Sequence, residues 1–166
     1  MNDTETLSAA LPDSLEKATR RLLTAAHERG LVLATAESCT GGMLASLLTD
    51  VQGRAHVFDR GFVTYSEEAK AELLGVPPAL IEDKGAVSME VAVAMAEGAL
   101  GRSRADIAQA TTGFADSGDE PGLVYLACFR AGRATVSSAH RFGPIGRGGV
   151  RIATLEAAID MMRRAL

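Results

Sequence analysis

Residues 31–42 read LVLATAESCTGG, and this stretch decides the fold class. Its first six residues form an apolar run of strand length, and the preceding Gly30 is typical of the end of a helix. A helical pattern resumes at Met43, so the polar residues in between connect a buried strand to a helix. Such strand-to-helix junctions are the repeating feature of α/β proteins.

The same alternation continues on both sides of this stretch. Asp13 and Glu16 resemble a capping box and predict the start of an amphipathic helix. Ser66 and Ser88 are typical helix caps, and Gly75 with the prolines after it predicts the end of the helix that Ser66 begins. Further elements are predicted as strands at 57–65 and 106–112, a helix at 88–102 and a final helix at 148–166. This order predicts βαβ units.

The segments 123–130 and 135–142 break the alternation. They are joined by the tight turn Ala131-Gly132 and are predicted to form a β-hairpin, which makes the sheet mixed. The length of 166 residues suits one hydrophobic core. We therefore expect an α/β fold with a single domain at 13–166, preceded by a flexible lead-in at 1–12.

Composition and charge narrow the class of protein. The net charge of −4 and the absence of a Lys/Arg cluster argue against binding to nucleic acid. The apolar runs are shorter than the ~20 residues of a membrane span, and no signal peptide is visible, so we expect a cytoplasmic protein without a membrane partner. Cys39 and Cys128 show no metal-ligand spacing, and the three histidines are well separated. We expect no metal and no cofactor.

The first junction is the strongest candidate site. Ligands of open α/β sheets bind at the carboxyl ends of strands, and the N–H groups at a helix start can hold an anion. Ser38 and Thr40, with the glycines Gly41 and Gly42, would stand there. The alternative is that the hydroxyls only cap the helix and the glycines only permit close packing. Cys39 is a rival nucleophile, but no histidine or cation is assigned to it.

Two more junctions supply polar side chains. Tyr65 ends the second strand, and Lys70 lies about one turn into the next helix, although this lysine could equally belong to a solvated face. The third junction is formed by Thr112 and Gly113. Arg147 and Arg151 then lie four residues apart at the start of the last helix, a spacing that suits phosphate but is also common on exposed surfaces.

Several long motifs resemble the C-terminal domain of the CinA (competence/damage-inducible) family. They are TAESCTGG at 35–42, DRGFVTYSEEAKAELLGV at 59–76, GAVSMEVAVAMAEGAL at 85–100, SRADIA at 103–108 and GRGGVRIAT at 146–154. The resemblance implies a three-layer α/β/α arrangement on a mixed, mostly parallel five-stranded sheet. The chain looks like the stand-alone form of the family, as in the nicotinamide-nucleotide amidohydrolases, which convert nicotinamide mononucleotide to nicotinate mononucleotide and ammonia.

The resemblance also implies roles for individual residues. Ser38 matches the serine of the family's ESCTGG motif, and Tyr65 and Lys70 match its YSxxxK motif. These three are the expected catalytic residues. The expected substrate-binding residues are Thr40, Gly41, Gly42, Thr112, Gly113, Arg147 and Arg151. The expected partners are a small nucleotide substrate and further copies of the chain in a homo-oligomer.

This chain departs from the family pattern after Gly113. Where the family continues into a glycine-rich loop, residues 114–121 read FADSGDEP, and Pro144 replaces an acidic residue. Asp116 and Asp119 bring negative charge toward a site that is expected to take a phosphate. We therefore expect weaker substrate binding than a glycine-rich loop would give.

Hydrolysis of an amide requires a nucleophile, a base and oxyanion donors. The hypothesis from the sequence is that neutral Lys70 takes the proton of Ser38, whose oxygen attacks the carbonyl, while the backbone of 39–41 holds the oxyanion. Burial or a nearby cation such as Arg151 would lower the pKa of Lys70. Two alternatives stay open: Ser38 could instead orient an attacking water, or the chain could be a degenerate, non-catalytic module that binds a nucleotide or a protein partner.

Overall fold

The structure, a computed structural model, describes residues 11–166. Most of the predicted lead-in at 1–12 lies outside the described residues. In chain order the elements are α1 (Asp13–Glu28), β1 (Leu33–Glu37), α2 (Met43–Thr49), the 3-10 turn η1 (Ala55–Val57), β2 (Phe58–Val63), α3 (Glu67–Leu74), α4 (Pro78–Lys84), α5 (Met89–Gly101), β3 (Ile107–Gly113), β4 (Leu123–Arg130), β5 (Val136–Arg141) and α6 (Gly146–Ala165).

The five strands form one mixed sheet in the order β2-β1-β3-β4-β5. β1 pairs in parallel with β2 and with β3, whereas β4 runs antiparallel to both β3 and β5. Four of the five strands therefore share one direction, and the predicted hairpin of β4 and β5 is confirmed. At the end of β1, Glu37 lies between Val63 of β2 and Thr111 of β3. The carboxyl ends of the three parallel strands thus meet at one edge.

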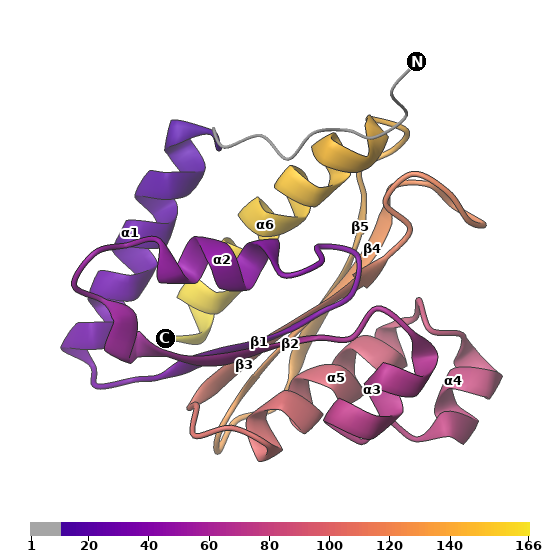
Figure 1. The fold of residues 1–166 in the computed structure, drawn as a ribbon, viewed down its shortest axis with the longest axis horizontal. Helices are drawn as coiled ribbons and strands as arrows, with labels where there is room; N and C mark the ends of the chain where they lie inside the picture. The colour runs from indigo at the N-terminus through magenta and orange to yellow at the C-terminus, as the bar shows by residue number, and fades with distance from the viewer. Residues whose placement is uncertain (1–10) are drawn as a thin grey trace.

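Helices cover both faces of this sheet (Figure 1). α1, α2 and α6 lie on one face, and α3, α4 and α5 lie on the other. The alternation of β1 serves both layers, because Leu33 belongs to the core under α1 and α6 while Ala34 and Ala36 belong to the core under α5. The three-layer α/β/α arrangement implied by the family resemblance is confirmed.

One local expectation was wrong. Asp13 is the first helical residue of α1, and its N-cap, Pro12, makes no side-chain cap, so the capping box is not formed. The predicted end of the helix at Gly75 is confirmed, and Pro78 then begins a short helix, α4, that was not predicted. Proline fits this position since the first N–H of a helix has no partner. The predicted final helix is confirmed as α6, which begins at Gly146, two residues before the approximate predicted start.

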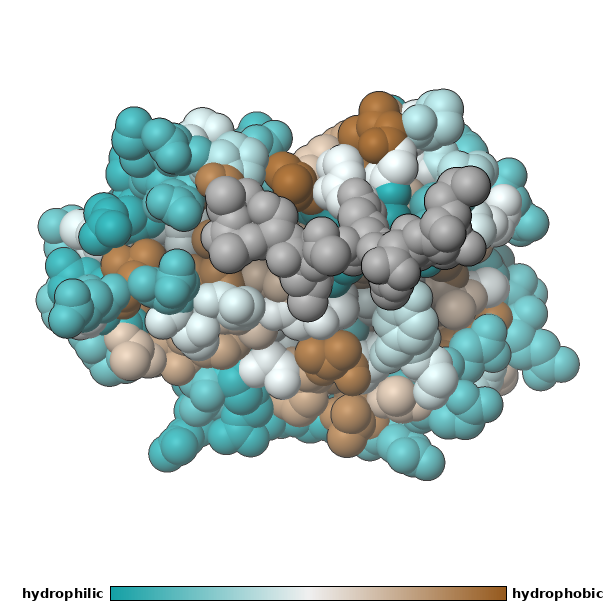
Figure 2. All heavy atoms as spheres, turned by 45° about the horizontal axis from the view of Figure 1, so that its top comes forward, coloured by the Kyte–Doolittle hydropathy of each residue, from teal (hydrophilic) through white to brown (hydrophobic). Residues whose placement is uncertain are grey.

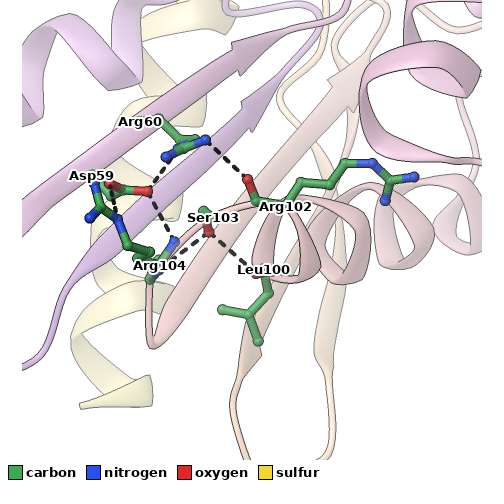
Figure 3. Close-up of polar contacts among 7 residues, drawn as sticks. Asp59, Arg60, Leu100, Arg102, Ser103 and Arg104 are labelled. Carbon is green, nitrogen blue, oxygen red and sulfur yellow. Dashed lines mark hydrogen bonds and ion pairs between the residues drawn. The ribbon is translucent and has the colours of Figure 1, made fainter.

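The edge strand β2 is held at its amino end by a cluster of polar contacts around Asp59 (Figure 3). Its carboxylate accepts a hydrogen bond from the backbone N–H of Arg104 at 3.0 Å and one from Arg60 Nε at 2.7 Å. These bonds hold the pKa of Asp59 below its ordinary value. Arg60 also donates to the carbonyl of Arg102 at 3.2 Å. The cluster ties β2 to the loop before β3, although β1 separates these strands.

The surface mixes polar and apolar residues. On the face in Figure 2, hydrophobic side chains form small separate patches among hydrophilic ones. None of the helices within residues 11–166 combines the length and the apolar composition that a bilayer crossing requires.

Close packing of α5 against the end of α3 gives a test of the fold. A Cβ atom at Gly98 would lie 2.0 Å from the carbonyl oxygen of Leu74, so Gly98→Ala must push the two helices apart. We expect the free energy of unfolding, measured by urea denaturation, to fall by about 1–3 kcal/mol. Gly101→Ala is the matched control, because no atom lies within 4 Å of its added Cβ. It should be neutral or stabilising by up to about 1 kcal/mol. Equal losses in both variants would contradict this packing argument.

Candidate active site

A cavity of about 290 Å³ lies at the carboxyl ends of the parallel strands. Its lining comes from all three predicted junctions and from the start of α6. The lining residues are Ser38, Cys39, Tyr65, Ser66, Glu67, Lys70, Ala86, Val87, Thr112, Gly113, Phe114, Ala115, Asp116, Ser117 and Arg147. The structure therefore brings together the three predicted catalytic residues and three of the seven predicted substrate-binding residues.

Ser38 and Lys70 are in direct contact inside this cavity. Lys70 Nζ lies 3.1 Å from Ser38 Oγ and donates a second hydrogen bond to the carbonyl oxygen of Thr64 at 2.8 Å. Lys70 is buried with 2% of its surface exposed, and within residues 11–166 no carboxylate forms an ion pair with its amine. Burial lowers the pKa of Lys70 below its ordinary value of 10.5, whereas Cys39 and Glu67 oppose this shift. Burial, not Arg151, lowers this pKa.

The buried side chain of Glu37 organises the turn that carries Ser38. Its Oε2 accepts hydrogen bonds from the backbone N–H groups of Gly42 at 3.1 Å and Leu44 at 2.9 Å, and its Oε1 accepts one from Ala45 at 2.8 Å. The hydroxyl of Thr40 also donates to Oε2 at 2.6 Å. Glu37 thus takes the N–H groups at the start of α2 that an external anion would otherwise use.

The remaining backbone donors of this turn are few. The N–H of Ser38 donates to the carbonyl of Thr111 at 3.0 Å, and that of Gly41 donates to the carbonyl of Ser38 at 3.0 Å. Within residues 11–166, the N–H groups of Cys39 and Thr40 donate to no other residue. Of the predicted oxyanion donors at 39–41, these two are therefore the ones that a ligand could use.

Cys39 lines the cavity but is a poor nucleophile. Burial raises the pKa of its thiol to about 11, although a hydrogen bond with Thr111 lowers it in part. A thiol with this pKa stays protonated at neutral pH, and the thiolate is the reactive form. Ser38 therefore remains the better candidate.

The other predicted residues take different positions. Tyr65 lies at the rim and is 66% exposed. The hydroxyl of Thr112 donates to the carbonyl of Ala86 at 2.9 Å, which ties β3 to the loop before α5. A Cβ atom at Gly113 would lie 2.7 Å from the carbonyl oxygen of Leu123, so glycine permits the close pairing of β3 and β4.

The two arginines of α6 point to different partners. Arg151 donates from Nη2 to the carbonyl of Thr40 at 2.9 Å, and its Nε is buried without a hydrogen-bond partner. Arg151 does not line the cavity. Arg147 does, and it forms a two-point ion pair with Asp116, with Nη2 to Oδ1 at 2.7 Å and Nε to Oδ2 at 3.1 Å. Hydrogen bonding to Tyr65, followed by that to Asp116, raises the pKa of Arg147.

Two residues of the site were not selected from the sequence. They are Glu37, which holds the turn, and Thr64, whose carbonyl orients Lys70. Asp116 was expected near the site, but its ion pair with Arg147 was not predicted. An acidic residue just before a helix start is a visible signal for Glu37, because carboxylates favour that end of a helix. Within residues 11–166, no three His, Cys, Asp or Glu side chains are grouped so as to hold a metal ion.

Comparison with known proteins places this geometry in a family. The sequence profile of the CinA C-terminal domain matches residues 15–166. The chain belongs to the CinA family. It is 46% identical over 159 residues to a CinA-like protein of Geobacter sulfurreducens, a match that covers 93% of this chain and 37% of the relative. It is also 46% identical over 167 residues to a CinA-like protein of Citrifermentans bemidjiense, covering 96% of this chain and 40% of the relative. The chain thus spans less than half of the length of these two relatives.

Solved structures of the CinA family share the fold. A competence/damage inducible protein from Agrobacterium tumefaciens, called CihA, superposes with a TM-score of 0.90 at 42% identity, over 93% of this chain and 97% of that one. A CinA superfamily protein from Escherichia coli gives a TM-score of 0.87 at 31% identity, over 100% of this chain and 99% of that one.

A second cavity, of about 390 Å³, lies between the end of α6 and the β4–β5 hairpin. Its polar lining includes Arg130, Arg133, His140 and Asp160. Arg130 already binds the backbone carbonyls of Ala165 and Leu166. This cavity also holds a hydroxyl–base contact, since Ser138 Oγ lies 2.8 Å from His140 Nε2. Both residues belong to the edge strand β5 and are only half-buried, whereas Lys70 is 2% exposed and lies at the carboxyl ends of the parallel strands. The cavity of Ser38 and Lys70 is therefore the better candidate.

The role of Glu37 can be tested through stability. Glu37→Gln replaces one acceptor oxygen by an NH₂ group that faces backbone donors, so we expect the free energy of unfolding to fall by about 1.5–3 kcal/mol. Glu72→Gln is the control, because this residue is exposed on α3 and should change stability by no more than about 0.5 kcal/mol. Chemical denaturation of both variants measures the difference. If Glu37→Gln were as stable as the control, Glu37 would not hold the turn.

Proposed function

We propose that this chain is an amidohydrolase that converts nicotinamide mononucleotide and water to nicotinate mononucleotide and ammonia. The observation that carries the proposal is the 3.1 Å contact between the buried amine of Lys70 and the hydroxyl of Ser38. A nucleophile within hydrogen-bond reach of a base, and a base oriented by a third group, is the arrangement that nucleophilic catalysis requires. Here the carbonyl of Thr64 is the orienting group.

Lys70 suits the role of base because its amine is buried without a carboxylate partner among the described residues. A neutral amine accepts the proton of Ser38 Oγ as that oxygen forms a bond to the carboxamide carbon. The protonated Lys70 then gives the proton to the leaving NH₂ group, which departs as ammonia. Water attacks the resulting acyl ester in the same way, with Lys70 as base, and releases the carboxylate and Ser38.

The oxyanion of this reaction needs donors close to Ser38. The N–H of Cys39 fits best, because Cys39 lines the cavity and its N–H donates to no other described residue. The N–H of Thr40 is the second candidate. Tyr65 at the rim would face the part of the substrate nearest to solvent.

The choice of substrate rests on the likeness of the motifs around Ser38 and Lys70 to those of nicotinamide-nucleotide amidohydrolases. The cavity adds that a cation, Arg147, stands at its mouth, where a phosphate could be bound. In an alternative route to the same products, Ser38 orients a water that attacks the carboxamide carbon directly. Trapping of an acyl ester on Ser38 by rapid quenching and mass spectrometry distinguishes the two routes.

A non-catalytic module is the second candidate function. One observation favours it: Asp116 already occupies Arg147, the cation that a nucleotide phosphate would use. A module of this kind would bind the nucleotide or a partner without turnover. The direct contact of Ser38 with Lys70 opposes it, because a binding module gains nothing from a buried amine.

Release of ammonia from nicotinamide mononucleotide by the purified protein tests the proposal. Ser38→Ala and Lys70→Ala should each lower kcat by roughly 10²–10⁴-fold, and the double variant should be hardly slower than either. This non-additivity is expected because the two groups act as one unit. Binding of the nucleotide without ammonia release would favour the module, and additive losses would refute the pairing of Ser38 with Lys70.

The pH dependence of turnover gives an independent check. Only the deprotonated amine of Lys70 acts as base, and burial lowers its pKa below 10.5. The value of kcat/KM should therefore rise with pH and level off above the folded-state pKa of Lys70, below the 10.5 of an exposed lysine. A profile that is flat from pH 6 to 10 would show that Lys70 does not have to lose a proton for catalysis.

A further inference from the structure

Arg147 is the cation at the mouth of the cavity, and it is not free to meet a ligand. It binds both carboxylate oxygens of Asp116, at 2.7 and 3.1 Å, in the parallel geometry by which guanidinium recognises carboxylate or phosphate. The two side chains come from the start of α6 and from the loop after β3. Both line the cavity. Asp116 thus stands where an anionic group of a ligand would bind Arg147.

Contacts within the loop after β3 hold Asp116 beside Arg147. The N–H of Phe114 donates to the carbonyl of Leu123 at 2.9 Å, and the N–H of Gly122 donates to the carbonyl of Phe114 at 2.7 Å, so the loop is closed at its base. The ring of Phe114 packs on Gly118, where an added Cβ atom would lie 2.2 Å from the ring. Gly118 has a φ of 101°, which favours glycine. The carboxylate is therefore presented by a tight turn.

The ion pair between Arg147 and Asp116 sets the charge that a ligand meets in the cavity. The two cations of the lining are Lys70 and Arg147, and the two carboxylates are Glu67 and Asp116. When Lys70 acts as a neutral base, Arg147 carries the positive charge of the lining, and Asp116 neutralises it. A phosphate monoester carries about −1.5 to −2 charges at pH 7. It therefore meets no uncompensated cation in the lining unless Asp116 moves away.

We propose that Asp116 is a specificity-determining residue: it is an internal anion that a phosphate monoester must displace from Arg147 to bind in this cavity. The side chains of Arg147 and Asp116 are 37% and 39% exposed, so a ligand can reach the pair from solvent. Exposed ion pairs are weak enough to be exchanged for a dianion. Asp116 therefore reduces the affinity for ligands that carry a phosphate and leaves the affinity for their dephosphorylated forms unchanged.

The same loop offers a matched control. Asp119 has the same charge, is exposed and does not line the cavity. The neighbouring Glu120 binds Arg141 at 2.8 Å, away from Arg147. The two aspartates expected from the sequence to repel the substrate thus differ, because only Asp116 contacts Arg147.

The experiment is calorimetric titration of the full chain with ribose 5-phosphate, a probe that needs no turnover. Asp116→Asn should bind it roughly three- to tenfold more tightly than the original chain, because the competing carboxylate is gone. Asp119→Asn should stay within about twofold, since an exposed charge that makes no contact is screened. In an Arg147→Ala background, Asp116→Asn should give no comparable gain. Equal or weaker binding by Asp116→Asn, or an equal gain from Asp119→Asn, would overturn the proposal.

This inference rests on the proposed function for the identity of the substrate. Kinetic measurements distinguish the displacement of Asp116 from the amidohydrolase activity. Asp116→Asn should lower the KM for nicotinamide mononucleotide and leave the KM for nicotinamide riboside unchanged. Tighter binding of ribose 5-phosphate without any ammonia release would refute the amidohydrolase and support the displacement of Asp116. Ammonia release with an unchanged affinity for ribose 5-phosphate in Asp116→Asn would support the amidohydrolase and refute the displacement.

Discussion

The hydrogen bonds that the Glu37 carboxylate accepts are the constraint on which the rest of the site depends. A carboxylate buried at a helix start is costly unless donors surround it, and here Gly42, Leu44, Ala45 and Thr40 supply them. The helix gains a partner for its first N–H groups, and its dipole stabilises the negative charge. The carboxylate needs these donors and the helix start needs this acceptor, so the end of β1 and the start of α2 form one rigid unit.

Ser38 follows Glu37 directly in the chain, so its position is fixed by the same hydrogen bonds. The carbonyl of Glu37 accepts the N–H of Thr64 at 2.8 Å, which aligns the end of β2 with the end of β1. The carbonyl of Thr64 in turn orients the amine of Lys70 toward Ser38. One residue thus fixes the nucleophile through its place in the chain and the base through its backbone. A buried lysine without a carboxylate lowers stability, and such a cost is expected where the amine has a chemical task.

The fold followed from the sequence because its signals are local. Neighbouring residues alone identify the short apolar runs, the caps Ser66 and Ser88, and the turn before β5. The structure has both serine caps and the hairpin. The differences lie where one local signal has two meanings. Proline ends one helix but also begins the next, as Pro78 does in α4. Asp13 has a side chain typical of a helix cap, but it is already the first helical residue of α1.

The site was only partly predictable because it depends on contacts between distant residues. Arg147 and Arg151 lie four apart on α6, a spacing that suggested a shared phosphate. In the folded chain, Arg151 instead binds the carbonyl of Thr40, 111 residues away, and a Cβ atom at Gly41 would lie 3.2 Å from its Nη2. Glycine at that position therefore makes room for a guanidinium that supports the turn, while Arg147 faces the cavity and Asp116. The same residue type thus supports the turn at one position and lines the cavity, paired with Asp116, at the other, and only the tertiary fold decides which arginine takes which place.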